Sequence, residues 1–123
     1  MRQSAYLLFQ LAQPFLEIRQ FCTAKFNVQF PQFDKIEVNG ANEHPLYTFL
    51  KAQKGFSGFD TNDQRGKFMD EMLRKRDADY DQKSDIKWNF TKFLISRDGQ
   101  VLKRYEPTAK MEDLEADIRA LSK

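Results

Sequence analysis

Cysteine and histidine are almost missing from this sequence, which contains one of each, Cys22 and His44. One cysteine excludes an intramolecular disulfide, a Cys-x-x-Cys redox motif and a multi-cysteine zinc site. One histidine excludes a histidine cluster for a metal. We therefore expect no bound metal and no cofactor, and a reducing cytoplasm as the compartment.

The sequence also lacks an excess of charge of one sign. Twenty basic and 18 acidic residues give a net charge of +2, so no strong positive field is available for a phosphate backbone or an anionic membrane. The basic run Arg74–Arg76 is followed directly by Asp77 and Asp79, whose negative charges cancel much of its positive field. The composition argues against a nucleic-acid partner and against a membrane partner.

Long hydrophobic runs are absent. The run from Ala5 to Leu11 is broken by Gln10, and it is far shorter than the roughly 20 apolar residues that cross a bilayer. Gln13 and Pro14 follow it, in place of a small-residue cleavage site. We expect neither a membrane span nor secretion.

Glycine and proline are scarce, whereas apolar residues are not. The chain of 123 residues has 5 Gly, 4 Pro and 12 Phe, and 41% of its residues are hydrophobic. Such a composition is typical of a packed globular domain, and the length suits one domain. We expect a single domain over 1–123, with a divergent N-terminal segment at 1–14 and a polar insertion at 56–87.

Apolar spacing predicts a helix in the first part of the chain. Phe15, Ile18, Cys22 and Phe26 recur at intervals of three or four residues, which places them on one helix face. Residues 33–38 alternate apolar and charged side chains and predict a half-buried strand. This strand is expected to end at the Asn39-Gly40 turn.

A second helix is predicted to begin at Asn42 as its cap, with His44 packed at its start. Leu46, Phe49 and Leu50 are expected to form its buried face. Within the polar stretch 56–87, the apolar residues at 68–73 predict an amphipathic helix. The same stretch carries alternating carboxylates at 77–85, but it lacks the glycine and glutamate of a calcium loop, so a solvated loop is expected.

The C-terminal third predicts a hairpin and a helix. Apolar strands at 90–95 and 101–105 flank an Asp98-Gly99 turn. Apolar residues at 111, 114, 118 and 121 then line one helix face. The fold class expected from this order is α/β, a small mixed sheet flanked by helices.

Three stretches, read together, resemble the glutathione peroxidase family. They are E-I-R-Q-F-C at 17–22 with F-N-V-Q-F-P at 26–31, K-I-E-V-N-G at 35–40 with H-P-L-Y at 44–47, and W-N-F-T-K-F-L-I at 88–95 with Asp98-Gly99 and Arg104-Tyr105. The resemblance runs from residue 17 to the end. It implies a thioredoxin-like, glutathione-peroxidase-type fold, here N-terminally truncated.

The resemblance also implies an activity and its site residues. Family members reduce hydrogen peroxide or organic hydroperoxides with a selenocysteine or cysteine nucleophile and a thiol reductant, thioredoxin or glutathione. Trp88 and Asn89 stand at the family's Trp and Asn positions, where they would donate hydrogen bonds to the reacting sulfur and lower its pKa. The alternative is that Trp88 anchors the sheet edge and Asn89 caps a strand.

The sequence departs from the family in its first part. The N-V-A-S-x-C-G loop with the nucleophile and the F-P-C-N-Q-F run with the family's Gln are both missing. Ungapped counting puts Tyr6 at the Gln position, and nothing in the spacing supports Gln10 or Gln13 as a substitute. We expect weak or absent peroxidase activity in this truncated chain, and an exposed sheet that favours homo-oligomers.

Cys22 coincides with the resolving-cysteine position of two-cysteine family members. The resemblance implies that it would condense with an oxidised peroxidatic cysteine to a disulfide that thioredoxin reduces. The alternative is a buried small hydrophobic residue on the face of Ile18 and Phe26. At the level of function, the alternative is a non-catalytic thioredoxin-like binding or redox-sensing module that uses Cys22.

Overall fold

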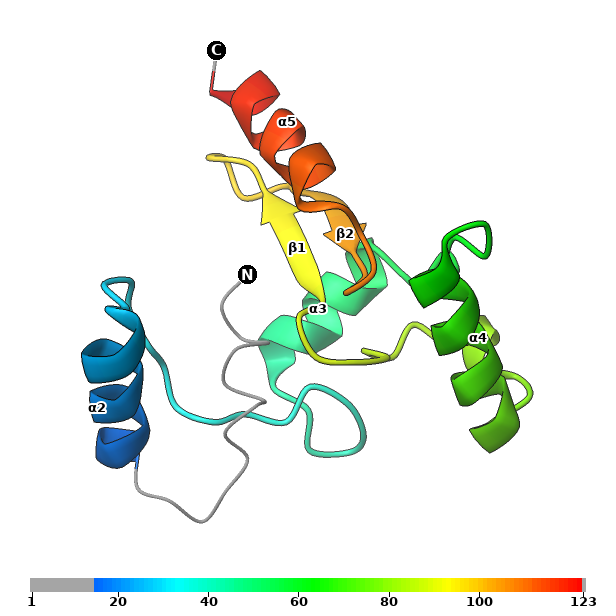
Figure 1. Cartoon of the computed structure of the whole chain (residues 1–123), viewed down its shortest axis with the longest axis horizontal. Coiled ribbons are helices and arrows are strands. Elements are labelled where there is room, and N and C mark those ends of the chain that lie inside the picture. Colours follow the sequence, from blue (N-terminus) through cyan, green and yellow to red (C-terminus); the bar gives the residue numbers. More distant parts are fainter. Residues whose placement is uncertain (1–14, 123) are drawn as a thin grey trace.

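The structure is a computed structural model that describes residues 15–122 (Figure 1). Its helices are α2 (Phe15–Phe26), α3 (Pro45–Gln53), α4 (Gln64–Arg76) and α5 (Met111–Leu121), with a short 3-10 helix, η1 (Tyr80–Gln82), and two strands, β1 (Lys92–Ile95) and β2 (Val101–Tyr105). The predicted helices at 15–26, around 68–73 and at the C-terminal end are confirmed, and so is the hairpin.

The hairpin is the centre of the fold. β1 and β2 pair antiparallel, with Phe93 opposite Arg104 and an irregularity between Leu94 and Ile95. Their turn contains Gly99 at φ +88°, a left-handed conformation that glycine adopts without steric cost. Among the described helices and strands, β1 and β2 are the only two whose backbones lie close together over several residues.

Helices cover both faces of the hairpin. Successive side chains of a strand point to opposite faces, so neighbouring residues of β1 contact different helices. Phe93 faces α3 and packs in a cluster with Val38, Tyr47, Leu50 and Ile86. On the opposite face, a second cluster joins Leu94, Tyr105 and Leu114 of α5. Figure 1 shows α3 behind the hairpin and α5 against its other side. The layers are therefore helix, sheet, helix.

The strand predicted at 33–38 is wrong. These residues form no strand, and the sheet of the described residues consists of β1 and β2 alone. A strand needs a hydrogen-bonded neighbour, and none of the residues in 15–122 pairs with this segment as a sheet. Its alternation has a different basis: Val38 is buried and Ile36 is half-buried against the α3 cluster. Over residues 15–122, a two-stranded antiparallel sheet thus stands in place of the predicted mixed sheet.

Helix α3 begins later than the sequence predicted, and its buried face shares only Leu50 with the predicted one. His44, not Asn42, is the N-cap, and its Nδ1 accepts a hydrogen bond of 3.1 Å from the Leu46 amide. Tyr47, Leu50 and Lys51 are buried, whereas Leu46 and Phe49 are exposed. The apolar pattern was right at Leu50 and wrong at Leu46 and Phe49, because a lysine lies in the core and these two apolar residues do not.

Contacts of its aromatic rings connect the polar stretch 56–87 within itself and to the hairpin. The rings of Phe56, Phe59 and Tyr80 lie with centroids 5.1–6.4 Å apart. The Arg104 guanidinium of β2 lies 5.7 Å from the Phe56 ring. Because α4 is capped by Asp63 and held at Asp70 by the Tyr80 hydroxyl at 2.5 Å, the stretch has a packed structure of its own.

Candidate functional site

Trp88 and Asn89 lie in a tight turn that leads into β1. Phe90, the next residue, has φ +67°, a strained left-handed backbone that non-glycine residues rarely adopt. The Thr91 hydroxyl closes the turn by donating a 3.1 Å hydrogen bond to the Trp88 carbonyl. Thr91 is only 2% exposed. The Thr91 contact at the start of β1 therefore fixes the backbone of Trp88 and Asn89, from which the two site side chains project.

Both side chains have hydrogen-bond donors to spare. Trp88 is 40% exposed and Asn89 is half-buried. Within residues 15–122, neither the Trp88 indole nor the Asn89 amide makes a side-chain hydrogen bond. An indole N–H and an amide N–H₂ are the kinds of donor that stabilise a thiolate or a developing oxyanion.

The segment just before this turn is held by side chains from distant parts of the chain. Asn39 Nδ2 donates to the Ile86 carbonyl and Asn39 Oδ1 accepts from the Ile86 amide, both at 2.8 Å. Arg104 donates to the carbonyls of Ser84 and Asp85 at 2.6 and 2.9 Å. None of these contacts was predicted from the sequence.

Cys22 lies elsewhere. It is a half-buried free cysteine on α2, and α2 stands to one side of the molecule, away from β1 (Figure 1). On its predicted apolar face Ile18 and Cys22 are half-buried, but Phe26 is 64% exposed. The structure therefore does not bring Cys22 together with Trp88 and Asn89. Tyr6, Gln10 and Gln13 lie outside the described residues.

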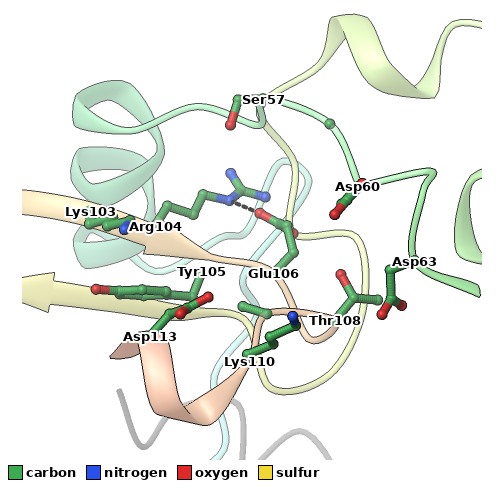
Figure 2. A pocket seen from close by; sticks show the side chains of 12 residues that line it. Ser57, Asp60, Asp63, Lys103, Arg104, Tyr105, Glu106, Thr108, Lys110 and Asp113 are labelled. Atoms are coloured by element: carbon green, nitrogen blue, oxygen red, sulfur yellow. Dashed lines mark hydrogen bonds and ion pairs between the residues drawn. The ribbon is translucent and has the colours of Figure 1, made fainter. Parts of the chain in front are cut away.

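A cavity of about 350 Å³ opens beside β2 and the start of α5. Arg104 and Glu106 lie at its inner wall, joined by a 2.6 Å ion pair, while Asp60, Thr108 and Lys110 lie around them (Figure 2). Burial raises the pKa of the Glu106 carboxyl, and the nearby Arg104 charge opposes this shift. One carboxylate oxygen of Glu106 has no hydrogen-bond partner among the described residues.

Comparison with known proteins identifies the relatives of this chain. A family model described as glutathione peroxidase matches residues 10–51. The glutathione peroxidase homolog of Neisseria meningitidis is 47% identical over 107 residues, covering 85% of this chain and 57% of the relative. The hydroperoxy fatty acid reductase of Synechocystis is 42% identical over 105 residues, covering 85% and 52%. The chain belongs to the glutathione peroxidase family.

The solved structures agree with this family assignment. The apo crystal structure of Trgpx matches with a TM-score of 0.54 and 33% identity, covering 76% of this chain and 48% of that protein. The predicted fold class, a glutathione-peroxidase-type thioredoxin-like α/β fold, is confirmed. The chain spans about half the length of the curated relatives it matches.

The family membership leaves the roles of individual residues as predictions. The residues matched by the glutathione peroxidase model include Cys22, Asn39 and Lys51. Trp88 and Asn89 lie beyond them. The boundaries at 1–14 and 56–87 likewise stay predictions. No helix within residues 15–122 is long and apolar enough to cross a membrane.

Buried polar residues are what sequence reasoning missed at this site. The sequence predicts a turn at Asn39 and a strand at Arg104, and the resemblance includes both residues, but none of these signals indicates that they hold 84–86. The partner of Asn39, Ile86, is 47 residues further along the chain. Periodicity and turn rules describe neighbours within a few residues, so no signal of those kinds could have found this contact.

Proposed function

We propose that this chain supplies part of a thiol-dependent peroxidase site that reduces hydrogen peroxide or organic hydroperoxides. The observation that carries the proposal is the Trp88–Asn89 turn at the start of β1, whose two donor side chains make no hydrogen bond within residues 15–122. Family membership at 40–47% identity to proteins named as glutathione peroxidases supports it. The names of these relatives concern proteins about twice as long as the matched region.

The proposed chemistry is attack of a thiolate on the peroxide. The sulfur forms a bond to one oxygen, the O–O bond breaks, and water or an alcohol leaves after taking up a proton. The resulting sulfenic acid condenses with a second thiol, releasing water and forming a disulfide, which thioredoxin or glutathione reduces. Trp88 and Asn89 would act by hydrogen-bonding the sulfur, which favours the thiolate and so lowers its pKa.

The reacting sulfur has to come from outside these 123 residues. Their one cysteine, Cys22, lies on α2, apart from Trp88 and Asn89. We therefore propose that the chain by itself has weak or no peroxidase activity, and that Cys22 takes the resolving role. This proposal supports thioredoxin over glutathione as the reductant, and it needs no cofactor.

The test is peroxide consumption by the purified chain with thioredoxin or glutathione, run beside Cys22→Ser. We expect no turnover by either protein alone. Turnover should appear when a fragment of a family member carrying the N-V-A-S-x-C-G loop is added. Trp88→Phe and Asn89→Ala should then each lower the rate about 10- to 100-fold, because hydrogen bonds to charged groups contribute about 1.5–3 kcal/mol.

Turnover by the chain alone that disappears in Cys22→Ser would contradict this proposal, because Cys22 would then be the nucleophile. A second candidate function is a binding or redox-sensing module that uses Cys22 for a mixed disulfide. The position of Cys22 on a helix that stands apart from the core favours it. A thioredoxin complex linked through Cys22, with no turnover after addition of the fragment, would support this candidate instead.

A further inference from the structure

The segment 84–87, just before the Trp88–Asn89 turn, belongs to no helix or strand. Its backbone groups therefore lack the partners that a ladder supplies, and buried backbone groups need partners from elsewhere. The segment nevertheless contributes to the core at one residue, because Ile86 is buried in the α3 cluster with Val38 and Phe93 while Ser84 and Asp85 are exposed. What holds this segment decides where the turn and its two site side chains lie.

Asn39 holds Ile86 in the way that a neighbouring strand would. Its side-chain amide donates to the Ile86 carbonyl and accepts from the Ile86 amide, at 2.8 Å in each case. Asparagine suits this task because one amide group carries both a donor and an acceptor. Both backbone hydrogen-bonding groups of Ile86, two residues before Trp88, are thereby occupied by a residue 47 positions away.

Lys51 fixes the orientation of the Asn39 amide. Its ammonium lies 3.2 Å from Asn39 Oδ1 and is held by Glu43 at 2.8 Å. A lysine can only donate, so it requires the oxygen of the amide on its own side and leaves Nδ2 directed at the Ile86 carbonyl. Lys51 is 7% exposed, which makes it a buried charge that the Glu43 and Asn39 contacts compensate.

Arg104 holds the other side of the same segment. Its Nη1 and Nη2 donate to the Ser84 and Asp85 carbonyls at 2.6 and 2.9 Å, and its Nε donates to Glu106 at 2.6 Å. The Arg104 side chain is 3% exposed, whereas Ser84 and Asp85 are exposed, so a buried cation anchors the outer part of the segment through charge-assisted hydrogen bonds. Because Arg104 sits on β2 opposite Phe93, it links the segment to the hairpin.

We propose that Asn39, Lys51 and Arg104 are positioning residues that clamp the segment 84–86 and thereby place Trp88 and Asn89 at the start of β1. The effect of the clamp on catalysis rests on the proposed function. The effect of the clamp on the position of the turn does not, because the conformation of Trp88 can be measured without any peroxidase activity.

The test uses the fluorescence of Trp88, the only tryptophan of the chain. In Asn39→Ala, loss of the clamp should release the turn and shift the Trp88 emission to the red. The acrylamide quenching constant should rise by at most about 2.5-fold, because Trp88 is already 40% exposed. Asn39→Asp keeps the acceptor for the Ile86 amide but sets a carboxylate oxygen against the Ile86 carbonyl oxygen, so it should also release the turn.

The matched control is Asp63→Ala, which removes the N-cap of α4 without touching the clamp. It should lower the melting temperature and leave the Trp88 fluorescence of the folded protein unchanged. Arg104→Lys, which keeps the charge but loses the planar fork, should behave like Asn39→Ala. The proposal is overturned if Asn39→Ala and Asp63→Ala both lower the melting temperature and both leave the quenching of Trp88 at the wild-type value.

Discussion

At the scale of single residues, three charged side chains are largely shielded from solvent. Lys51, Arg104 and Glu106 are all largely buried. Burying a charge is costly unless it is paired and hydrogen-bonded, and removal of one partner leaves the other charge uncompensated. Arg104 donates three hydrogen bonds, whereas one oxygen of Glu106 has no hydrogen-bond partner in the described part of the chain. Glu106 is therefore the weakest member of this set.

Glu106→Gln should reveal this weakness through pH. Burial raises the pKa of Glu106 above its ordinary value of 4.5. A raised folded-state pKa means that the contribution of this carboxyl to stability is complete below pH 4.5 and is lost as the pH rises through its folded-state pKa. Glutamine has no such dependence. Urea unfolding from pH 4.5 to 7 should therefore show Glu106→Gln gaining stability relative to wild type as the pH rises.

The opposite trend would contradict this reasoning. If Glu106→Gln lost stability relative to wild type with rising pH, the attraction between Glu106 and Arg104 would outweigh the cost of burial. The surface carboxylates Asp70 and Asp117 offer a contrast, since hydrogen bonds from Tyr80 and Tyr105 lower their pKa. Their contribution is lost as the pH falls, below the range of this experiment.

At the scale of elements, local patterns predicted what local interactions determine. The helix around 68–73, the C-terminal helix and the hairpin are confirmed because spacing and a turn glycine specify them. The strand at 33–38 and two of the three residues predicted for the buried face of α3, Leu46 and Phe49, are wrong for one shared reason. Both depend on which distant element lies alongside: Val38 packs on Phe93, and buried Lys51 contacts Glu43 and Asn39. Periodicity carries no information on such partners.

Helix α4 offers a substitution for which propensity predicts the wrong sign. Gly66→Ala in a helix would ordinarily stabilise a protein by about 1 kcal/mol. Here the added Cβ would overlap the Asp60 carbonyl oxygen and lie 2.8 Å from its carbon, both backbone atoms. We expect net destabilisation of about 1–3 kcal/mol, as in overpacked cores, measured by thermal or urea unfolding.

Gly55→Ala is the control for this substitution. The nearest atom to its added Cβ would be the Ser84 hydroxyl oxygen at 3.1 Å, the end of a side chain that can rotate away. Its effect should stay within about 1 kcal/mol, because a less flexible unfolded chain offsets a small adjustment. If Gly66→Ala were as stable as wild type, the expectation would be contradicted, because the loop at Asp60 would then move aside at little cost in free energy.

At the scale of the whole molecule, large apolar side chains remain at the surface. Phe26 on α2, Phe68 on α4 and Ile95 on β1 are 64%, 63% and 44% exposed. The outer edge of β1 pairs with no strand of the described residues, and uncovered edges invite pairing with another chain. We expect the purified chain to associate, with light scattering after gel filtration giving a mass above that of the monomer.

Ile95→Lys should reduce this association, because a lysine on an edge strand opposes pairing. Leu121→Lys at the end of α5 is the matched variant, since it adds the same charge at an exposed apolar site away from the sheet. A wild-type monomer at all concentrations would contradict the expectation. Equal reduction by both variants would assign the association to general apolar exposure and not to the edge.

The candidate site was predictable from the sequence only in part, and the reason lies at this scale too. The turn at Trp88 and Asn89 could be named because its residues are consecutive. The separation of Cys22 from that turn, and the contacts that hold 84–86, depend on how α2, α3 and β2 are arranged around the hairpin. This arrangement depends on the whole folded chain, and no sequence motif predicts it.

The long span of the Asn39–Ile86 contact also bears on the order in which the molecule folds. The hairpin pair Lys92–Tyr105 closes a short loop, whereas Asn39 meets a residue 47 positions away. Closing a loop roughly four times as long costs about 1 kcal/mol more chain entropy, and non-local contacts form later as a rule. The hairpin is thus expected to form first. The contacts around Trp88 are expected to form last, once Asn39 and Ile86 have come together.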